Sequence, residues 1–169
     1  MRYCIEIFGN NWGFETMDES DRRSPAFTKK DCAKLQVLQN TILKLQTGLP
    51  RDYPTNQLLT KTGNLSIHQL IAFQTLTQVF KVINNKKPHY LSTKFNIRNP
   101  ENNRAFPHRK VNTVLVTNSK LSITRGGFIF RGQTLWNLLP ASLRNCKIEK
   151  EFKTEVRNWV SNNIGTKPP

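Results

Sequence analysis

The apolar residues of this chain are spaced as on one face of a helix in three separate segments, and this spacing favours a mainly helical fold. The first stripe is Leu35, Leu38, Ile42 and Leu45; the second is Phe73, Leu76, Val79, Phe80 and Ile83; the third is Phe152, Val156, Trp159, Val160 and Ile164. Each stripe needs a second element against which it can be buried. We therefore predict three or more helices packed around a shared core.

Short sequence signals mark the ends of two of these helices. Gly48, followed by Pro50, is typical of residues just beyond a helix C-terminus. Ser66 and Gln69 form a capping-box pattern, in which the serine hydroxyl and the glutamine amide satisfy free backbone N–H groups. The polar segment 84–88 ends that second helix. His68 falls in its first turn, where a surface or capping role is favoured over catalysis.

Residues 111–131 carry a different pattern, typical of short strands. Residues 111–117 are rich in β-branched side chains, a turn can form at 118–119, and the segment Phe128–Phe130 follows a pair of glycines. We therefore predict a short hairpin-like sheet, which makes the fold class α+β but mainly α. Residues 1–31 form a first segment that ends in a polar linker. Residues 32–169 form a basic helical domain with short strands around 111–131.

Charge is the strongest functional signal in the sequence. The chain has a net charge of +15, and residues 53–148 hold fourteen Lys and Arg against the single acid Glu101, which leaves +13 in that stretch. Such a field attracts polyanions and releases their counterions when they bind. Nucleic acid is the first candidate partner, and an anionic membrane surface is the second.

The polar, asparagine-rich loop 92–112 carries much of this charge. Cationic side chains on an extended backbone can follow the phosphates of a nucleic-acid strand. Phe95 and Phe106 lie among them and can stack on unpaired bases, although anchoring to the core is the commoner role. The candidate nucleic-acid-binding residues are Lys86, Lys87, Lys94, Arg98, Arg104, Arg109, Lys110, Lys120, Arg125 and Arg131.

The sequence offers no catalytic or metal site. Two-metal phosphoryl transfer needs paired carboxylates, and only Glu101 lies between Asp52 and Glu149. The three cysteines and three histidines are scattered without metal-ligand or disulfide spacing, which suits idle thiols in a reducing compartment. No run of about 18 apolar residues is present, so we expect no membrane-spanning helix. We predict no cofactor and no catalytic residue.

Four segments of the chain resemble the C-terminal portion of reverse transcriptases from non-LTR, LINE-type retrotransposons of the jockey kind. These segments are Tyr3–Gly9, Leu35–Asn40, Lys87–Leu91 and Gly132–Arg144, the last of which, followed by Phe152-Lys153, is the most specific. The resemblance implies that residues 1–31 include a remnant of the polymerase thumb. It also implies that the parent enzyme is an RNA-directed DNA polymerase. The Tyr-x-Asp-Asp element that binds the catalytic metals is absent, so we expect this chain to be inactive alone.

RNA or an RNA–DNA duplex is therefore the partner that we predict, with no membrane partner. A separate polymerase palm is a further candidate. Two other functions stay open. One is a protein–protein module that uses the 66–83 and 149–164 helices, marked by an exposed patch of Phe73, Phe80 or Trp159. The other is an inert truncated product. Neither the oligomeric state nor the compartment, cytoplasm or nucleus, follows from the sequence.

Overall fold

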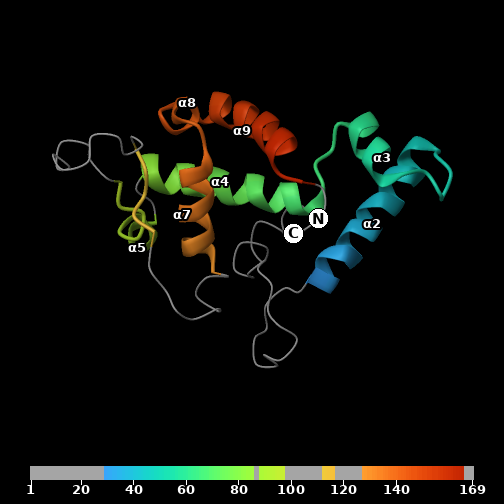
Figure 1. The fold of residues 1–169 in the computed structure, drawn as a ribbon, viewed down its shortest axis with the longest axis horizontal. Coiled ribbons are helices and arrows are strands. Elements are labelled where there is room, and N and C mark those ends of the chain that lie inside the picture. Colours follow the sequence, from blue (N-terminus) through green and yellow to red (C-terminus); the bar gives the residue numbers. More distant parts are fainter. Residues whose placement is uncertain (1–28, 86–87, 98–111, 117–126, 166–169) are drawn as a thin grey trace.

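The computed structural model describes residues 29–85, 88–97, 112–116 and 127–165, and the labels used here are those of Figure 1. These residues form α2 (Lys29–Thr47), α3 (Thr55–Thr62), α4 (Ile67–Asn85), α5 (His89–Ser92), α7 (Phe128–Leu138), α8 (Ala141–Arg144) and α9 (Glu149–Asn163). The prediction of a mainly helical fold is confirmed. Of the predicted segment 1–31, residues 1–28 lie outside the described residues, and the last three form the first turn of α2.

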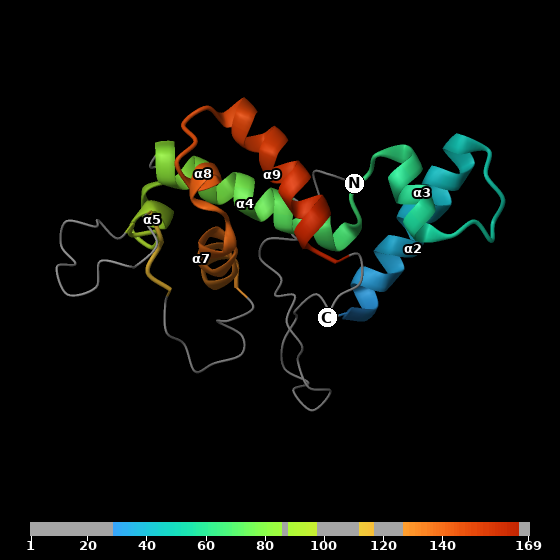
Figure 2. The ribbon, with the colours of Figure 1, turned by 45° about the horizontal axis from the view of Figure 1, so that its top comes forward.

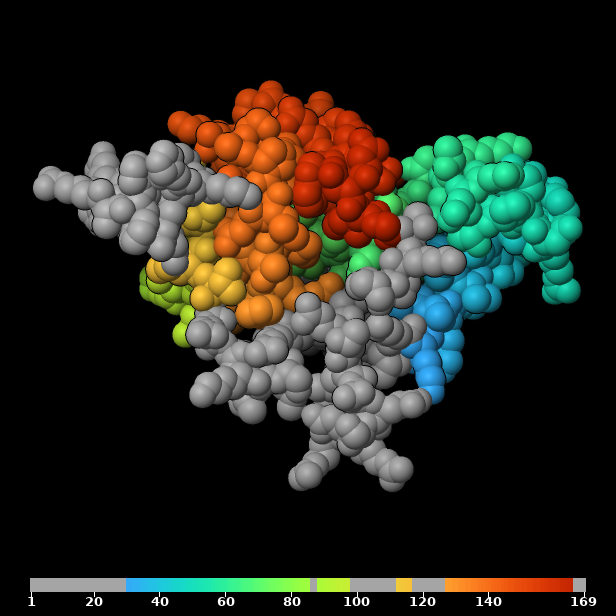
Figure 3. All heavy atoms as spheres, in the orientation of Figure 1, coloured from blue at the N-terminus to red at the C-terminus, as the bar shows by residue number. Residues whose placement is uncertain are grey.

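Helix α4 lies at the centre of the molecule. Helix α9 runs alongside it and α7 crosses it, while α2 and α3 form a separate lobe near the N-terminal end of α4 (Figures 1 and 2). The space-filling view shows α7, α8 and α9 side by side on one face, with the α2–α3 lobe at one end (Figure 3). Helices α4 and α9 pack together because their apolar stripes, the second and third of the sequence, are buried against each other.

The main core is built from these two stripes and from α7. Phe80 of α4 stacks on Phe152 of α9 with ring centroids 4.1 Å apart, and Trp136 of α7 lies 5.9 Å from the same Phe152 ring. The side chains of Leu76, Val79, Phe152, Val156 and Val160 have at most a trace of exposed surface. Burying side chains of this size contributes about 1.5–3 kcal/mol each. The predicted stripes of α4 and α9 are thus confirmed as core.

The capping box at the start of α4 is also confirmed. The backbone N–H of Ser66 donates to Gln69 Oε1 at 3.0 Å, and the backbone N–H of Gln69 donates to Ser66 Oγ at 3.2 Å. Gln69 Nε2 further donates to the carbonyl of Ile164 at 2.7 Å, beyond the C-terminus of α9. One side chain therefore caps α4 and also fixes the end of α9 against it.

The α2–α3 lobe has a small core of its own. Leu43 of α2 packs with Leu58 and Leu59 of α3, and the turn between the helices begins at Gly48, which has a positive φ of 65°. The left-handed conformation at Gly48 ends α2 where the sequence predicted. The lobe joins α4 through Leu35 of α2, which packs on a pair of buried isoleucines in the first turns of α4.

The four apolar residues that define the first stripe are not the buried ones of α2. Leu38, Ile42 and Leu45 are 53%, 44% and 78% exposed, and only Leu35 packs on α4. The helix itself was predicted correctly. The buried apolar residues of α2 are instead Cys32 and Leu43, the second of which packs on α3.

The predicted hairpin-like sheet is not found in the part of the chain that the structure describes. That part shows one isolated antiparallel bridge, between Ile97 and Val114. The segment Phe128–Phe130, predicted as a strand, is the first turn of α7. This prediction was wrong because two aromatic residues around an isoleucine have a local preference for strands, whereas tertiary packing decides the outcome. Residues 117–126, where the other half of the hairpin was expected, lie outside the described residues.

Gly132 is the contact point between α7 and α4. A Cβ atom at this position would lie 2.7 Å from Val79 Cγ2 and 3.2 Å from the ring of Phe95. A glycine in a helix interior costs about 0.5–1 kcal/mol relative to alanine. Here it lets α7 approach α4 and Phe95 closely enough to close the core.

Candidate nucleic-acid interface

Of the ten candidate residues for nucleic-acid binding, the structure describes two, Lys94 and Arg131. The others, which lie outside the described residues, are Lys86, Lys87, Arg98, Arg104, Arg109, Lys110, Lys120 and Arg125. The described residues that flank them in the sequence lie at 88–97, 112–116 and 127–147.

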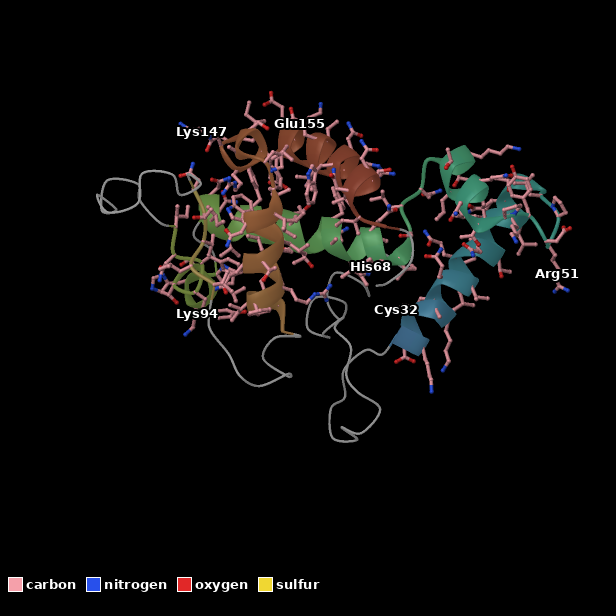
Figure 4. All side chains as sticks on the ribbon, in the orientation of Figure 1. Cys32, Arg51, His68, Lys94, Lys147 and Glu155 are labelled. Carbon is pink, nitrogen blue, oxygen red and sulfur yellow. The ribbon has the colours of Figure 1, made fainter. Side chains whose placement is uncertain are left out.

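Lys94 lies in the turn after α5, and its side chain extends outward from the molecule (Figure 4). Its backbone is firmly held, because Gln133 Nε2 of α7 donates to the Lys94 carbonyl at 2.7 Å. The next residue, Phe95, is buried and meets Phe128 edge to face with ring centroids 5.9 Å apart. Phe95 therefore anchors the loop to the core, the commoner of its two predicted roles, and is not a free stacking platform. Phe106 lies outside the described residues.

The other end of the basic loop is held by the same helix. Trp136 Nε1 donates to the Asn112 carbonyl at 3.2 Å. Asn137 bonds both backbone groups of Val114: its Nδ2 donates to the carbonyl at 2.9 Å, and its Oδ1 accepts from the N–H at 2.8 Å. We call Gln133, Trp136 and Asn137 the loop clamp. The clamp fixes residues 94 and 112–114, and the backbone N–H of Leu115 donates across to Asn96 at 3.1 Å.

Arg131 has a different setting from Lys94. Its side chain is partly buried on α7, and its positive charge acts on His68 of α4 and Cys32 of α2. Burial, together with that charge, lowers the pKa of His68 below its ordinary value. Burial and then the neighbouring Asp31 raise the pKa of Cys32 to about 11, so that this thiol is not activated. Arg131 thus faces the region where the starts of α2 and α4 come together.

The acids among the described residues lie in α2, in the α2–α3 turn and in α9. Glu149 lies 2.6 Å from Lys153 Nζ and 3.6 Å from Lys81 Nζ. The hydrogen bond from Lys153 is the main cause that lowers the pKa of Glu149. The positive charges of Lys81 and Lys153 are therefore partly neutralised by Glu149. Lys147 and Glu155 occupy the outer surface of the α8–α9 region (Figure 4).

Arg144 is one of the described cations that were not among the candidates. Arg144, the last residue of α8, is only 6% exposed, and its Nε and Nη1 atoms are enclosed without a hydrogen-bond partner. Burial lowers the pKa of this guanidinium below its ordinary value. No pattern in the sequence distinguishes Arg144 from an exposed basic residue, apart from its place at the end of the Gly132–Arg144 motif.

That motif is largely structural. Gly132 makes the close contact with α4, the loop clamp supplies three further positions, and Leu139 and Leu143 are buried in the main core. Its residues therefore hold the basic loop and close the core. The chemistry that they could offer a ligand is limited to Arg144.

The described residues contain no group of three or more His, Cys, Asp and Glu side chains that could hold a metal ion. Within the same residues, none of the helices combines the length and apolar character needed to cross a bilayer. Comparison of the chain with protein-family models, with curated proteins and with solved structures finds no match.

Proposed function

We propose that this chain is a non-catalytic C-terminal segment of a retrotransposon RNA-directed DNA polymerase that binds RNA or an RNA–DNA duplex through a basic surface. The charge supports this proposal first, since +13 of the net +15 lies in residues 53–148. The described part of that stretch contains six Lys and Arg and no acid. A surface of one sign over this length suits a polyanion.

The observation that carries the proposal is the loop clamp. Gln133, Trp136 and Asn137 bond the backbone on both sides of residues 98–111, which contain four of the candidate residues in sequence. Holding both ends of a loop to one helix reduces the conformational freedom that binding would have to remove. The clamp therefore fixes the described backbone at residue 94 and at residues 112–114, on either side of this cationic segment in the sequence.

Contacts of this kind would go mainly to phosphates. Lysine and arginine on a loop read the backbone of a nucleic acid, which positions the protein but carries no sequence information. We therefore expect binding that tolerates changes of sequence. In the parent enzyme such a segment would hold template and primer, and a separate palm would supply the metal-binding carboxylates.

Fluorescence anisotropy with a labelled RNA–DNA hybrid tests the proposal. We expect saturable binding at low salt, similar affinity for hybrids of unrelated sequence, and weaker binding as salt is raised. A variant that replaces Arg98, Arg104, Arg109 and Lys110 with glutamine should bind much more weakly. Absence of binding by the wild-type chain at low salt would overturn the proposal.

The exposed stripe of α2 favours a second candidate function, self-association. Leu35, Leu38, Ile42 and Leu45 follow the 3-4-3 spacing of a coiled-coil seam, and the last three are exposed. The partner that this stripe fits is a second copy of the chain. Helix α2 carries four lysines and one acid, Asp31, so self-association through it should strengthen as salt screens the repulsion between two copies.

The predicted protein–protein module used other residues. Phe80 is buried in the main core, and Phe73 and Trp159 are partly buried against it, so these three aromatics do not form an exposed patch. Sedimentation velocity separates the two candidate functions. Self-association predicts a concentration-dependent dimer that is lost when Leu38 and Leu45 are both replaced by glutamine. A wild-type chain that stays monomeric would rule out self-association and leave nucleic-acid binding unaffected.

A further inference from the structure

Arg144 is buried, and no neighbouring side chain among the described residues pairs with its charge. Its side chain is almost wholly enclosed, yet Nε and Nη1 donate no hydrogen bond. The ion pairs formed by the described acids involve Lys34, Lys81 and Lys153, and none involves Arg144. An enclosed charge without a partner is strongly unfavourable, so buried charges in proteins are nearly always paired.

The surroundings of Arg144 connect it to the basic loop. The next residue, Asn145, accepts a hydrogen bond from Asn112 Nδ2 at 2.5 Å. The carbonyl of that same Asn112 accepts from Trp136 in the loop clamp. Arg144 therefore ends α8 next to the point where the C-terminal end of the loop is fixed to the core.

We infer that Arg144 binds a phosphate group of the nucleic-acid backbone. This inference rests on the proposed function and names one contact of the same surface. A guanidinium presents five N–H donors in a planar arrangement that matches the oxygens of a phosphate, and charge-assisted bonds of this kind are the strong ones. Nε and Nη1 are enclosed in the free protein, so the guanidinium must turn toward the phosphate, which then supplies the partners that these atoms lack. The energetic cost of holding Arg144 unpaired in the free protein would then be recovered on binding.

This account distinguishes Arg144 from an arginine that merely stabilises the fold. A structural arginine makes the free protein less stable when it is removed. An arginine kept for a ligand does the opposite or nothing, because its removal takes away an unpartnered buried charge. Arg144→Met is the informative variant, since methionine keeps an unbranched stem for packing and removes the guanidinium.

The test measures thermal stability and hybrid binding for the full chain and three variants. Arg144→Met should melt no lower than wild type and bind the RNA–DNA hybrid about tenfold to a hundredfold more weakly. The slope of log affinity against log salt should become less steep by about 0.7–0.9, one phosphate contact. Arg144→Lys should retain the slope but not the full affinity, because it keeps the charge without the planar fork. Arg51→Gln, in the α2–α3 turn and outside residues 53–148, removes one exposed charge far from this position and should change affinity less than about twofold.

Inorganic phosphate separates a backbone phosphate from a free one. Added to wild type, it should raise the melting temperature more than it does for Arg144→Met. If phosphate has this effect while the hybrid binds wild type and Arg144→Met equally, the assignment to the nucleic-acid backbone is overturned. A large drop in the melting temperature of Arg144→Met would make Arg144 a structural residue and overturn the inference as well. If wild type itself fails to bind the hybrid, the proposed function fails first and the inference with it.

Discussion

Asn137 does for Val114 what a neighbouring strand would do, since its amide bonds both the N–H and the carbonyl of that residue. Val114 is 2% exposed, so water does not readily replace these bonds. A buried backbone group that loses its partner costs about 1–3 kcal/mol. Asn137 of helix α7 therefore gives Val114 the two backbone hydrogen bonds that a neighbouring strand of the predicted sheet would have given.

The first prediction concerns this residue. Asn137→Ala should lower the free energy of unfolding by about 1–3 kcal/mol, as measured by urea denaturation, because both backbone groups of Val114 lose their partner. It should also weaken hybrid binding, because one end of the basic loop is released. Asn158→Ala, on the exposed side of α9, should stay within about 0.5 kcal/mol of wild type. An unchanged stability for Asn137→Ala would mean that the clamp does not hold the loop.

The second prediction concerns pH. Burial lowers the pKa of His68, so the folded protein binds a proton at this residue less readily than the unfolded chain does. The stability that His68 contributes is therefore fully present above its unfolded pKa of about 6.5 and is lost as pH falls through the folded value. Glu149, whose pKa is also lowered, adds a further loss only in more acidic solution.

Urea denaturation at about pH 5.5 and about pH 7.5 measures this effect. The wild-type chain should be less stable at the lower pH, and His68→Gln should show a smaller difference between the two. A difference of the same size in both proteins would show that another group controls stability in this range.

Among the helices, the sequence predictions were correct where all the residues that carry the signal lie within one short segment. The Ser66–Gln69 capping box, the end of α2 at Gly48 and the stripe of α9 each depend on residues close together in sequence. Helix α7 could not be predicted in this way. Its first turn contains residues that favour strands locally, and its place depends on a contact with α4, about fifty residues away in sequence.

The candidate site was predictable only in its charge. The loop and its basic residues are visible in the sequence, and Lys94 does extend outward. The loop clamp and the burial of Arg144 are not visible, because both arise where α7 and α8 meet residues from distant parts of the chain. The partial burial of Arg131 on α7 has the same origin.

The third prediction tests how α7 crosses α4. Gly132→Ala should reduce stability by about 1–3 kcal/mol, because the added Cβ would lie 2.7 Å from Val79 Cγ2 within a packed core. The gain in helix propensity of about 1 kcal/mol offsets part of this cost. Combining Gly132→Ala with Val79→Ala should give a smaller loss than the sum of the two single changes, since the second change makes room for the first.

Thr134→Ala is the matched control on the same helix. Thr134 is exposed, and its hydroxyl bonds only to the Phe130 carbonyl one turn earlier. This variant should stay within about 0.5 kcal/mol of wild type. If Gly132→Ala and Thr134→Ala behave alike, α7 and α4 do not pack as closely as the structure indicates.

On the scale of the whole molecule, hydrophobic packing and charge occupy different parts of the chain. Helices α4, α7 and α9 form the main core, and α2 and α3 form a lobe with an exposed apolar stripe. The excess positive charge lies in residues 53–148, much of it in sequence between elements that the core holds in place. In the proposed function, the described core would support the cationic stretch of the chain. Such a molecule needs no catalytic group to serve a polymerase that holds template and primer.

The salt dependence of hybrid binding tests this claim most directly. Anisotropy titrations with one labelled RNA–DNA hybrid, repeated from about 50 mM to about 200 mM monovalent salt, should give a linear fall of log affinity with log salt. We predict a loss of about a hundredfold or more over this range, the value expected for about four phosphate contacts. An affinity that does not change with salt, or no binding at the lowest salt, would contradict the account.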